Sequence, residues 1–222
     1  MAIDQLIARL RRAVMLDATA FEEARDDATF TPLALGAAAV AVFLAGLGTF
    51  LWSEVVADGL DGVFVDAVIL GSIFLILLWL AGMATAYVVL TQVYKESVAP
   101  DALARVMAMG HIPFALGLLI FIPGIGFAFG LLSVALMFFY TIYGIRAAFP
   151  SIDPFRVLLS TLAGFAVWAM ILPLLTGVGD TFAPGVFIYE VTEDVVEEGF
   201  GARSSVDDLD IDFGDFLDGD DN

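Results

Sequence analysis

Five long apolar runs constrain this chain more than any other feature. They lie at about residues 33–52, 63–90, 106–122, 125–145 and 157–176. About 20 predominantly apolar residues are enough for a helix to cross the hydrocarbon core of a bilayer. Backbone polar groups in that core must be satisfied within the segment, so separate runs of this length are expected to span as helices. We therefore predict an all-α fold, a polytopic membrane bundle of five transmembrane helices.

The composition agrees with a membrane protein and narrows the chemistry. The chain is 60% hydrophobic and only 16% charged, whereas a soluble domain is roughly half apolar and about a quarter charged. It has no cysteine and a single histidine, which excludes disulfides, thiolate chemistry and a multi-histidine metal centre. We expect a non-enzymatic protein with no cofactor, no nucleic-acid partner and no small-molecule substrate.

Three regions follow from the changes in composition. Residues 1–31 form an N-terminal segment, residues 32–176 the membrane domain, and residues 177–222 an acidic tail that we expect to be disordered. Apolar residues of 3–15 recur at helical spacing with the arginines mostly off that stripe, which predicts a short amphipathic helix on the membrane surface. A capping box at Thr19–Glu22 would start a second short helix. The alternative for both is a solvated arm.

The basic residues predict the orientation of the five spans. Lysine and arginine occur before the first run, in 91–105 and in 145–156, whereas the short connections 53–62 and 122–125 have none. Cytoplasmic loops carry the excess of basic residues in membrane proteins. We therefore expect a plasma-membrane protein with a cytoplasmic N-terminus and an acidic tail outside.

The sequence FIPGIG at 121–126 predicts a tight turn between the third and fourth spans. Pro123 would stop the third helix, and Gly124 would supply backbone angles that other residues avoid. Gly126 and Gly130 form a GxxxG pair, which lets two helices approach closely in a membrane. A phosphate-binding loop is disfavoured, because the Gly-Lys-Ser/Thr ending is missing.

His111 is the ionisable residue inside the third apolar run, and Pro113 follows it closely. Proline removes a backbone donor and leaves a carbonyl free. We expect a neutral imidazole that is hydrogen-bonded to such a carbonyl or to a neighbouring helix. Intramembrane ionisable residues are also candidates for function, so a ligand-binding or proton-linked role is the alternative.

Two stretches resemble the core of the Yip family of integral membrane proteins. These are ALARVMAMGHIPFALGLLIFIPGIGFAFGLL (102–132) and YTIYGIRAAFPSIDPFRVLLSTLAGF (140–165). The likeness includes the Ile-Pro-Gly-Ile-Gly turn and the Ile-Arg-x-Ala-Phe end of the fourth span, which contains Arg146. LDATAFEEARDD (16–27) is similar to the element that precedes the first span in prokaryotic members. His111 stands where members often carry an aromatic residue.

The resemblance implies five spans, a cytoplasmic N-terminus and an outward C-terminus. Eukaryotic members associate with Rab-type GTPases and with each other, but this chain lacks their long cytoplasmic N-terminal region. The function implied is that of a multi-pass membrane protein that acts through helix packing and contacts with homo- or hetero-oligomeric membrane partners, in membrane organisation or trafficking. A small-solute or ion transporter is the alternative.

The predicted topology can be tested by cysteine labelling, because the chain has no native cysteine. Single substitutions Ser97→Cys, Ser151→Cys and Ser204→Cys place one thiol in each of two basic loops and in the acidic tail. An impermeant maleimide should label only Ser204→Cys in intact cells, since the basic loops face the cytoplasm. Labelling of Ser151→Cys from outside would overturn the five-span topology.

Overall fold

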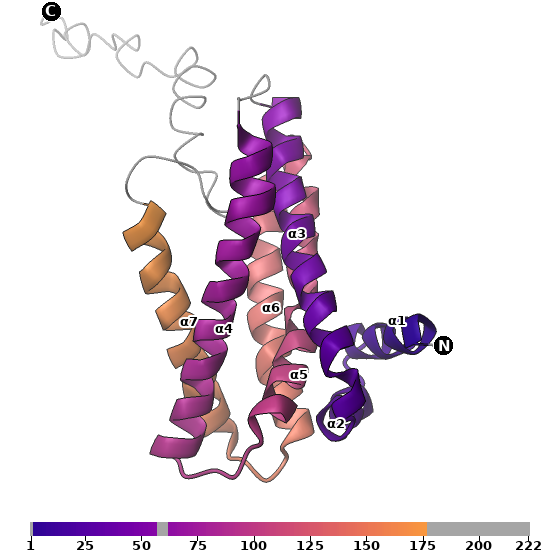
Figure 1. Cartoon of the computed structure of the whole chain (residues 1–222), viewed down its shortest axis with the longest axis vertical. Helices are drawn as coiled ribbons and strands as arrows, with labels where there is room; N and C mark the ends of the chain where they lie inside the picture. The colour runs from indigo at the N-terminus through magenta and orange to yellow at the C-terminus, as the bar shows by residue number, and fades with distance from the viewer. Residues whose placement is uncertain (1, 57–61, 177–222) are drawn as a thin grey trace, which may run out of the picture. The chain divides into compact units, whose positions relative to one another are not determined.

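The computed structural model describes residues 2–56 and 62–176, so the predictions for the acidic tail lie outside the described residues. The described part is all-helical (Figure 1). Its α-helices are α1 (Ala2–Val14), α2 (Ala18–Asp26), α3 (Thr31–Val56), α4 (Ser72–Val88), α5 (Pro100–His111), α6 (Gly126–Ala148) and α7 (Pro154–Thr176). Shorter elements are the 3₁₀ helices η1 (Ala28–Phe30) and η4 (Ile112–Phe121) and the π-helices η2 (Phe64–Gly71) and η3 (Val89–Val93).

The five predicted spans are confirmed as helices long and apolar enough to cross a membrane. They are Ala28–Val55, Phe64–Val93, Pro100–Phe121, Gly126–Ala148 and Pro154–Ile171. The second span is continuous because the π-helices η2 and η3 extend α4 at both ends. The chain is therefore an integral membrane protein with an all-α, five-span fold.

The third span begins earlier than the sequence predicts. The sequence predicts a polar connection at 91–105, but η3 continues to Val93 and α5 already begins at Pro100. Proline at the first turn of a helix costs no hydrogen bond, since that N–H would be unpaired in any case. Every residue from Ala102 to His111 is buried, including Arg105. The connection is thus only the stretch 94–99.

The third span changes from α-helix to 3₁₀-helix where Pro113 enters it. α5 ends at His111, and η4 then runs for ten residues from Ile112 to Phe121. A 3₁₀ helix rises about 2.0 Å per residue and an α-helix about 1.5 Å, so these 22 residues reach about 38 Å. That length matches the 26-residue helix α3, which is about 39 Å long. The tighter winding lets a shorter segment span the same height.

The third span is the centre of the bundle. Its η4 half lies between α3 and α6, and its α5 half contacts α6, α3 and α2. α4 packs mainly against α7, as Figure 1 shows. The span Pro100–Phe121 is also the most buried of the five, since 67% of its apolar 18-residue stretch is buried inside the structure.

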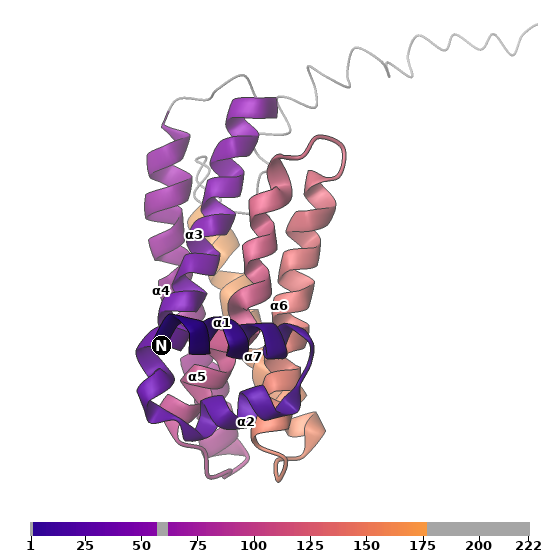
Figure 2. The same ribbon diagram turned by 90° about the vertical axis from the view of Figure 1, so that its right-hand side faces the viewer.

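The N-terminal helices are packed on the bundle and do not form a solvated arm. α1 runs across the long axis of the bundle in both Figure 1 and Figure 2. α2 packs on α5 and α6 through Ala20, Phe21 and Ala24, which are fully buried. The expected capping box at Thr19 is wrong, because the cap of α2 is Asp17, whose carboxylate accepts from the Thr19 N–H at 3.0 Å.

Two close helix crossings depend on glycine. A Cβ atom added to Gly82 of α4 would lie 2.9 Å from the carbonyl oxygen of Gly164 on α7. One added to Gly110 of α5 would lie 2.7 Å from the Cα of Thr141 on α6. Each partner is backbone, which cannot turn aside as a flexible side chain can. Small residues thus set the spacing of both helix pairs, as is typical of membrane bundles.

A matched pair of glycine-to-alanine substitutions tests this conclusion. Gly82→Ala should lower the free energy of unfolding in detergent by about 1–3 kcal/mol, because the added methyl group forces two backbones apart. Gly36→Ala is the control, since a Cβ atom there meets nothing within 4 Å. It should leave stability unchanged or raise it by up to about 1 kcal/mol through helix propensity. Equal effects in both variants would show that the α4–α7 crossing is not tightly packed.

Candidate functional site

Two features of the described residues stand out as candidate sites. The first is the end of the bundle that holds every lysine and arginine among the described residues, called here the basic end. It comprises α1, α2, the connections 94–99 and 149–153, and the adjoining ends of α5, α6 and α7. The second is a cavity between α4, α5, α6 and α7, called here the central cavity. Sequence reasoning found neither as a site, although it singled out His111, which lines the cavity.

Arg105 of α5 is the centre of the basic end. Its side chain is 3% exposed and makes four hydrogen bonds. Nε donates to the Ala24 carbonyl at 2.7 Å and Nη2 to the Arg25 carbonyl at 2.6 Å. These carbonyls belong to the last turn of α2, where helix carbonyls have no partner within the helix and carry partial negative charge. Arg105 therefore caps the C-terminus of α2.

The same guanidinium fastens the start of α3. Nη1 of Arg105 donates to Thr31 Oγ1 at 2.9 Å and to Asp101 Oδ2 at 2.8 Å. Thr31 is the first residue of α3, and Asp101 lies one turn before Arg105 on α5. A buried arginine is stable only where such acceptors surround it. In the sequence, Asp101 and Arg105 form an Asp-x-x-x-Arg pair on an otherwise apolar helix. The prediction of orientation, however, counts Arg105 among the basic residues of the connection 91–105.

Other side chains cap two further helix ends. Arg25 donates to the carbonyl of Ala148, the last residue of α6. Tyr140 and Tyr143 of α6 donate to the carbonyls of Val14 and Leu16, where α1 ends. Leu16 has a φ of 59°, a left-handed conformation that ends α1. Three helix C-termini thus meet at the basic end and are satisfied by side chains from other elements.

Ion pairs join α1 to the segment that follows it. Arg12 pairs with Glu23 of α2, and Arg9 lies 3.2 Å from Asp27 and over the ring of Phe30. The hydrogen bond from Arg12 lowers the pKa of the Glu23 carboxyl. The pKa of Asp27 is lowered first by the Thr29 hydroxyl and then by Arg9. These contacts fix the N-terminal helices as one unit.

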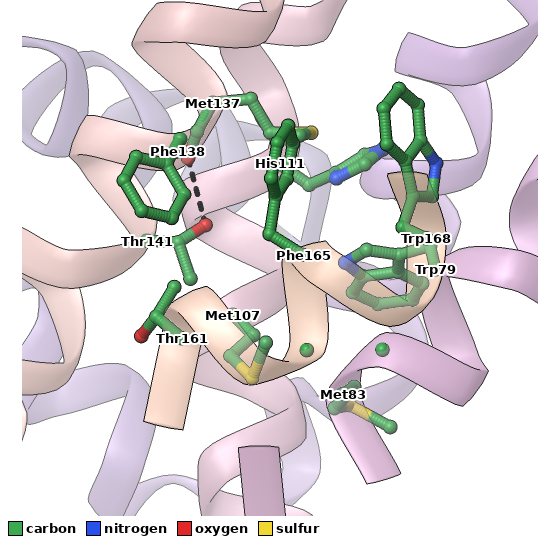
Figure 3. A pocket seen from close by; sticks show the side chains of 12 residues that line it. Trp79, Met83, Met107, His111, Met137, Phe138, Thr141, Thr161, Phe165 and Trp168 are labelled. Atoms are coloured by element: carbon green, nitrogen blue, oxygen red, sulfur yellow. Dashed lines mark hydrogen bonds between the residues drawn. The ribbon is translucent and has the colours of Figure 1, made fainter. Parts of the chain in front are cut away.

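The central cavity lies between four helices (Figure 3). Its volume, taken as the space that the centre of a water molecule can occupy, is about 50 Å³. Its lining is aromatic, sulfur-containing and small: Trp79, Gly82, Met83, Met107, His111, Met137, Phe138, Thr141, Thr161, Gly164, Phe165 and Trp168. His111 and Trp79 lie about halfway along their spans, so the cavity is near the middle of the bundle.

His111 brings an unpaired polar atom to this cavity. Its side chain is 5% exposed, and its Nε2 has no hydrogen-bond partner among the described residues. The ring centroids of Trp79 and Phe114 lie 5.2 and 5.3 Å from that of the imidazole. The expected hydrogen bond to a freed carbonyl or a neighbouring helix is therefore not formed at Nε2. A buried unpaired donor or acceptor costs about 1–3 kcal/mol, so its persistence needs an explanation.

The other residues singled out from the sequence do not line the central cavity. Gly124 occupies the turn between η4 and α6 with a φ of +81°, and η4 ends two residues before Pro123. Gly126 lies against the Ile120 carbonyl, within the same hairpin, and Gly130 is buried on α6. Pro113 lies just inside η4. Arg146 is exposed on α6, whereas Arg105 of α5 is buried.

Comparison with known protein families, with characterised proteins and with solved structures finds no match for this chain. The class that the fold defines is a multi-pass helical membrane protein with five candidate spans. No family match supports membership of the Yip family.

The paired carboxylate of Glu23 makes the attachment of α1 dependent on pH. A depressed pKa in the folded state means that the Arg12–Glu23 contact stabilises the structure above the ordinary glutamate value of 4.5 and is lost as pH falls below it. Spin labels at Ile7→Cys and Glu22→Cys should give a narrow distance distribution at pH 7 that broadens below about pH 4.5. The additional change Glu23→Gln should broaden it already at pH 7. A narrow distribution throughout would show that other contacts, such as those of Arg9, Tyr140 and Tyr143, are enough to hold α1 without the Arg12–Glu23 pair.

Proposed function

We propose that this chain is a Yip-like membrane protein that acts through helix packing and contacts with protein partners, without catalysing a reaction. The observation that carries the proposal is the construction of the basic end. A two-helix segment that could have been a loose arm is held by Arg105, by the two tyrosines and by ion pairs. A surface fixed before binding loses little conformational entropy when a partner docks.

The exposed side chains of the basic end suit such contacts. Ile7, Val14 and Met15 of the α1 region are more than half exposed, although each is apolar. An amphipathic helix that lies across the spans can place such residues in the headgroup layer of a membrane. The exposed charged residues of α2 and Arg146 of α6 then remain available to a protein.

The resemblance to the Yip family supports the same proposal. The residues that carry it include LDATAFEEARDD, which supplies Asp17, Phe21 and Glu23 to the basic end. The second resembling stretch supplies both tyrosines. In this proposal the basic end faces the cytoplasm, as the distribution of lysine and arginine predicts, and the partner is a membrane protein or a second copy of this chain.

Site-specific photo-crosslinking tests the proposal. A photoreactive amino acid in place of Glu22 on α2 should give a discrete crosslinked protein band in membranes. The same group in place of Ile125, exposed in the hairpin before α6, should not. Arg105→Met should abolish the Glu22 crosslink, because α2 loses its cap. Equal crosslinking at both positions, or a Glu22 crosslink that survives Arg105→Met, would contradict a partner surface built on the fixed basic end.

The central cavity favours a second candidate function, a small-solute transporter. Transporters bind their substrates near the bilayer midplane, often beside interrupted helices, and the third span changes its winding at Ile112 next to the cavity. Solute-dependent flux in proteoliposomes that is lost on narrowing the cavity, for example with Thr161→Leu, would favour this candidate over the scaffold.

A further inference from the structure

We propose that the central cavity binds the hydroxyl-bearing end of a neutral alcohol or phenol dissolved in the membrane. The inference is independent of the proposed partner binding. It starts from His111, which lines the cavity and whose buried Nε2 has no hydrogen-bond partner among the described residues. In Figure 3 the imidazole lies among Trp79, Phe165 and Trp168.

The charge of the lining determines the charge of the ligand. None of the residues that line the cavity is aspartate, glutamate, lysine or arginine. A charged group moved into such surroundings would lose its hydration and find no counter-ion. The ligand is therefore neutral.

The hydrogen-bonding groups determine its polar atom. The hydroxyls of Thr141 and Thr161 already donate, to the Met137 carbonyl at 2.8 Å and to the Val157 carbonyl at 2.9 Å. Their oxygens retain lone pairs that can accept a further hydrogen bond. Nε2 of a neutral imidazole is a donor in one tautomer and an acceptor in the other. A hydroxyl group satisfies either tautomer. It accepts from a protonated Nε2 and can then donate its own hydrogen to a threonine oxygen, or it donates that hydrogen to an unprotonated Nε2.

The remaining wall determines what is attached to that hydroxyl. Phe165 and Trp168 stack at 5.1 Å between centroids, and Phe138 lies 5.3 Å from Phe165. These rings favour carbon over water, which needs two to four polar partners. Three methionines, at 83, 107 and 137, can adjust their rotamers to the shape of a ligand.

The size of the cavity limits how much of the molecule enters. The volume that the centre of a water molecule can occupy is about 50 Å³. A water-sized group needs about 10–15 Å³ measured in this way, so the cavity holds roughly three to five groups of that size. That is a hydroxyl and the first few carbons. Trp79, Met83 and Phe138 are only partly buried, which places part of the wall at the surface of the bundle. The rest of the ligand can thus extend into the lipid.

Nitrogen NMR of the single histidine tests this site on the unaltered full chain. The protein would be ¹⁵N-histidine labelled, reconstituted in phosphatidylcholine nanodiscs and titrated with 4-bromophenol. We expect a saturable shift of the Nε2 signal, because the phenol supplies the missing hydrogen bond, and 4-methylphenol should give a saturable shift of its own. 4-Bromoanisole, of similar shape but without the hydroxyl hydrogen, should give no saturable shift. An equal response to both compounds, or a linear response only, means partition into the lipid and overturns the proposal.

Tryptophan fluorescence supplies a second measurement. Bromine quenches tryptophan on contact, and Trp79 and Trp168 line the cavity. Quenching by 4-bromophenol should saturate at the concentration that saturates the NMR shift. His111→Phe should raise that concentration about tenfold, the effect of one lost hydrogen bond. Saturable quenching unchanged in His111→Phe would place the phenol elsewhere and overturn the assignment to Nε2.

Discussion

The burial of Arg105 is the constraint on which the basic end of this protein depends. A guanidinium taken out of water is stable only if acceptors surround it, and the acceptors here come from three helices. Two are carbonyls of α2, one is the Thr31 hydroxyl of α3, and one is Asp101 of α5 itself. Removing α2 or shifting the start of α3 would leave the buried charge without some of these acceptors. The positions of these three helices are therefore linked through one side chain.

Because Arg105 lies in the third span, the link between these helices extends to the rest of the bundle. It contacts α3 and α6 along η4 and adds α2 at its α5 end. Pro113 shapes it, because proline cannot donate the hydrogen bond that an α-helix needs and its ring opposes the preceding turn. The 3₁₀ winding that results also brings Gly117 against Ala45 of α3, where an added Cβ would lie 2.7 Å from the alanine Cβ. The proline thus affects both the length of the span and its packing against α3.

The spans could be predicted from the sequence because apolar length is a local property. The turn at Gly124 was also local, since a Pro-Gly pair restricts the backbone whatever surrounds it. Arg105 was misplaced because counting basic residues treats an arginine at the end of an apolar run as part of a loop. Only the acceptors on α2 and α3, 74 to 81 residues away in sequence, show that it is buried. The central cavity was not predictable for the same reason: Trp79, Phe138 and Phe165 lie in separate runs, and each is an ordinary lipid-facing or core residue by itself.

The two candidate sites share one rigid element. Arg105 and His111 are six residues apart on α5, a separation of about 9 Å along a helix axis. Gly110, next to His111, rests against the backbone of Thr141, and Thr141 also lines the cavity. A group that enters the cavity and displaces α5 must therefore also displace the guanidinium relative to the α2 carbonyls. The hydrogen bonds of Arg105 are charge-assisted and directional, so even a small displacement would weaken the cap that holds α2. The cavity and the attachment of the N-terminal helices therefore share α5 as a common element.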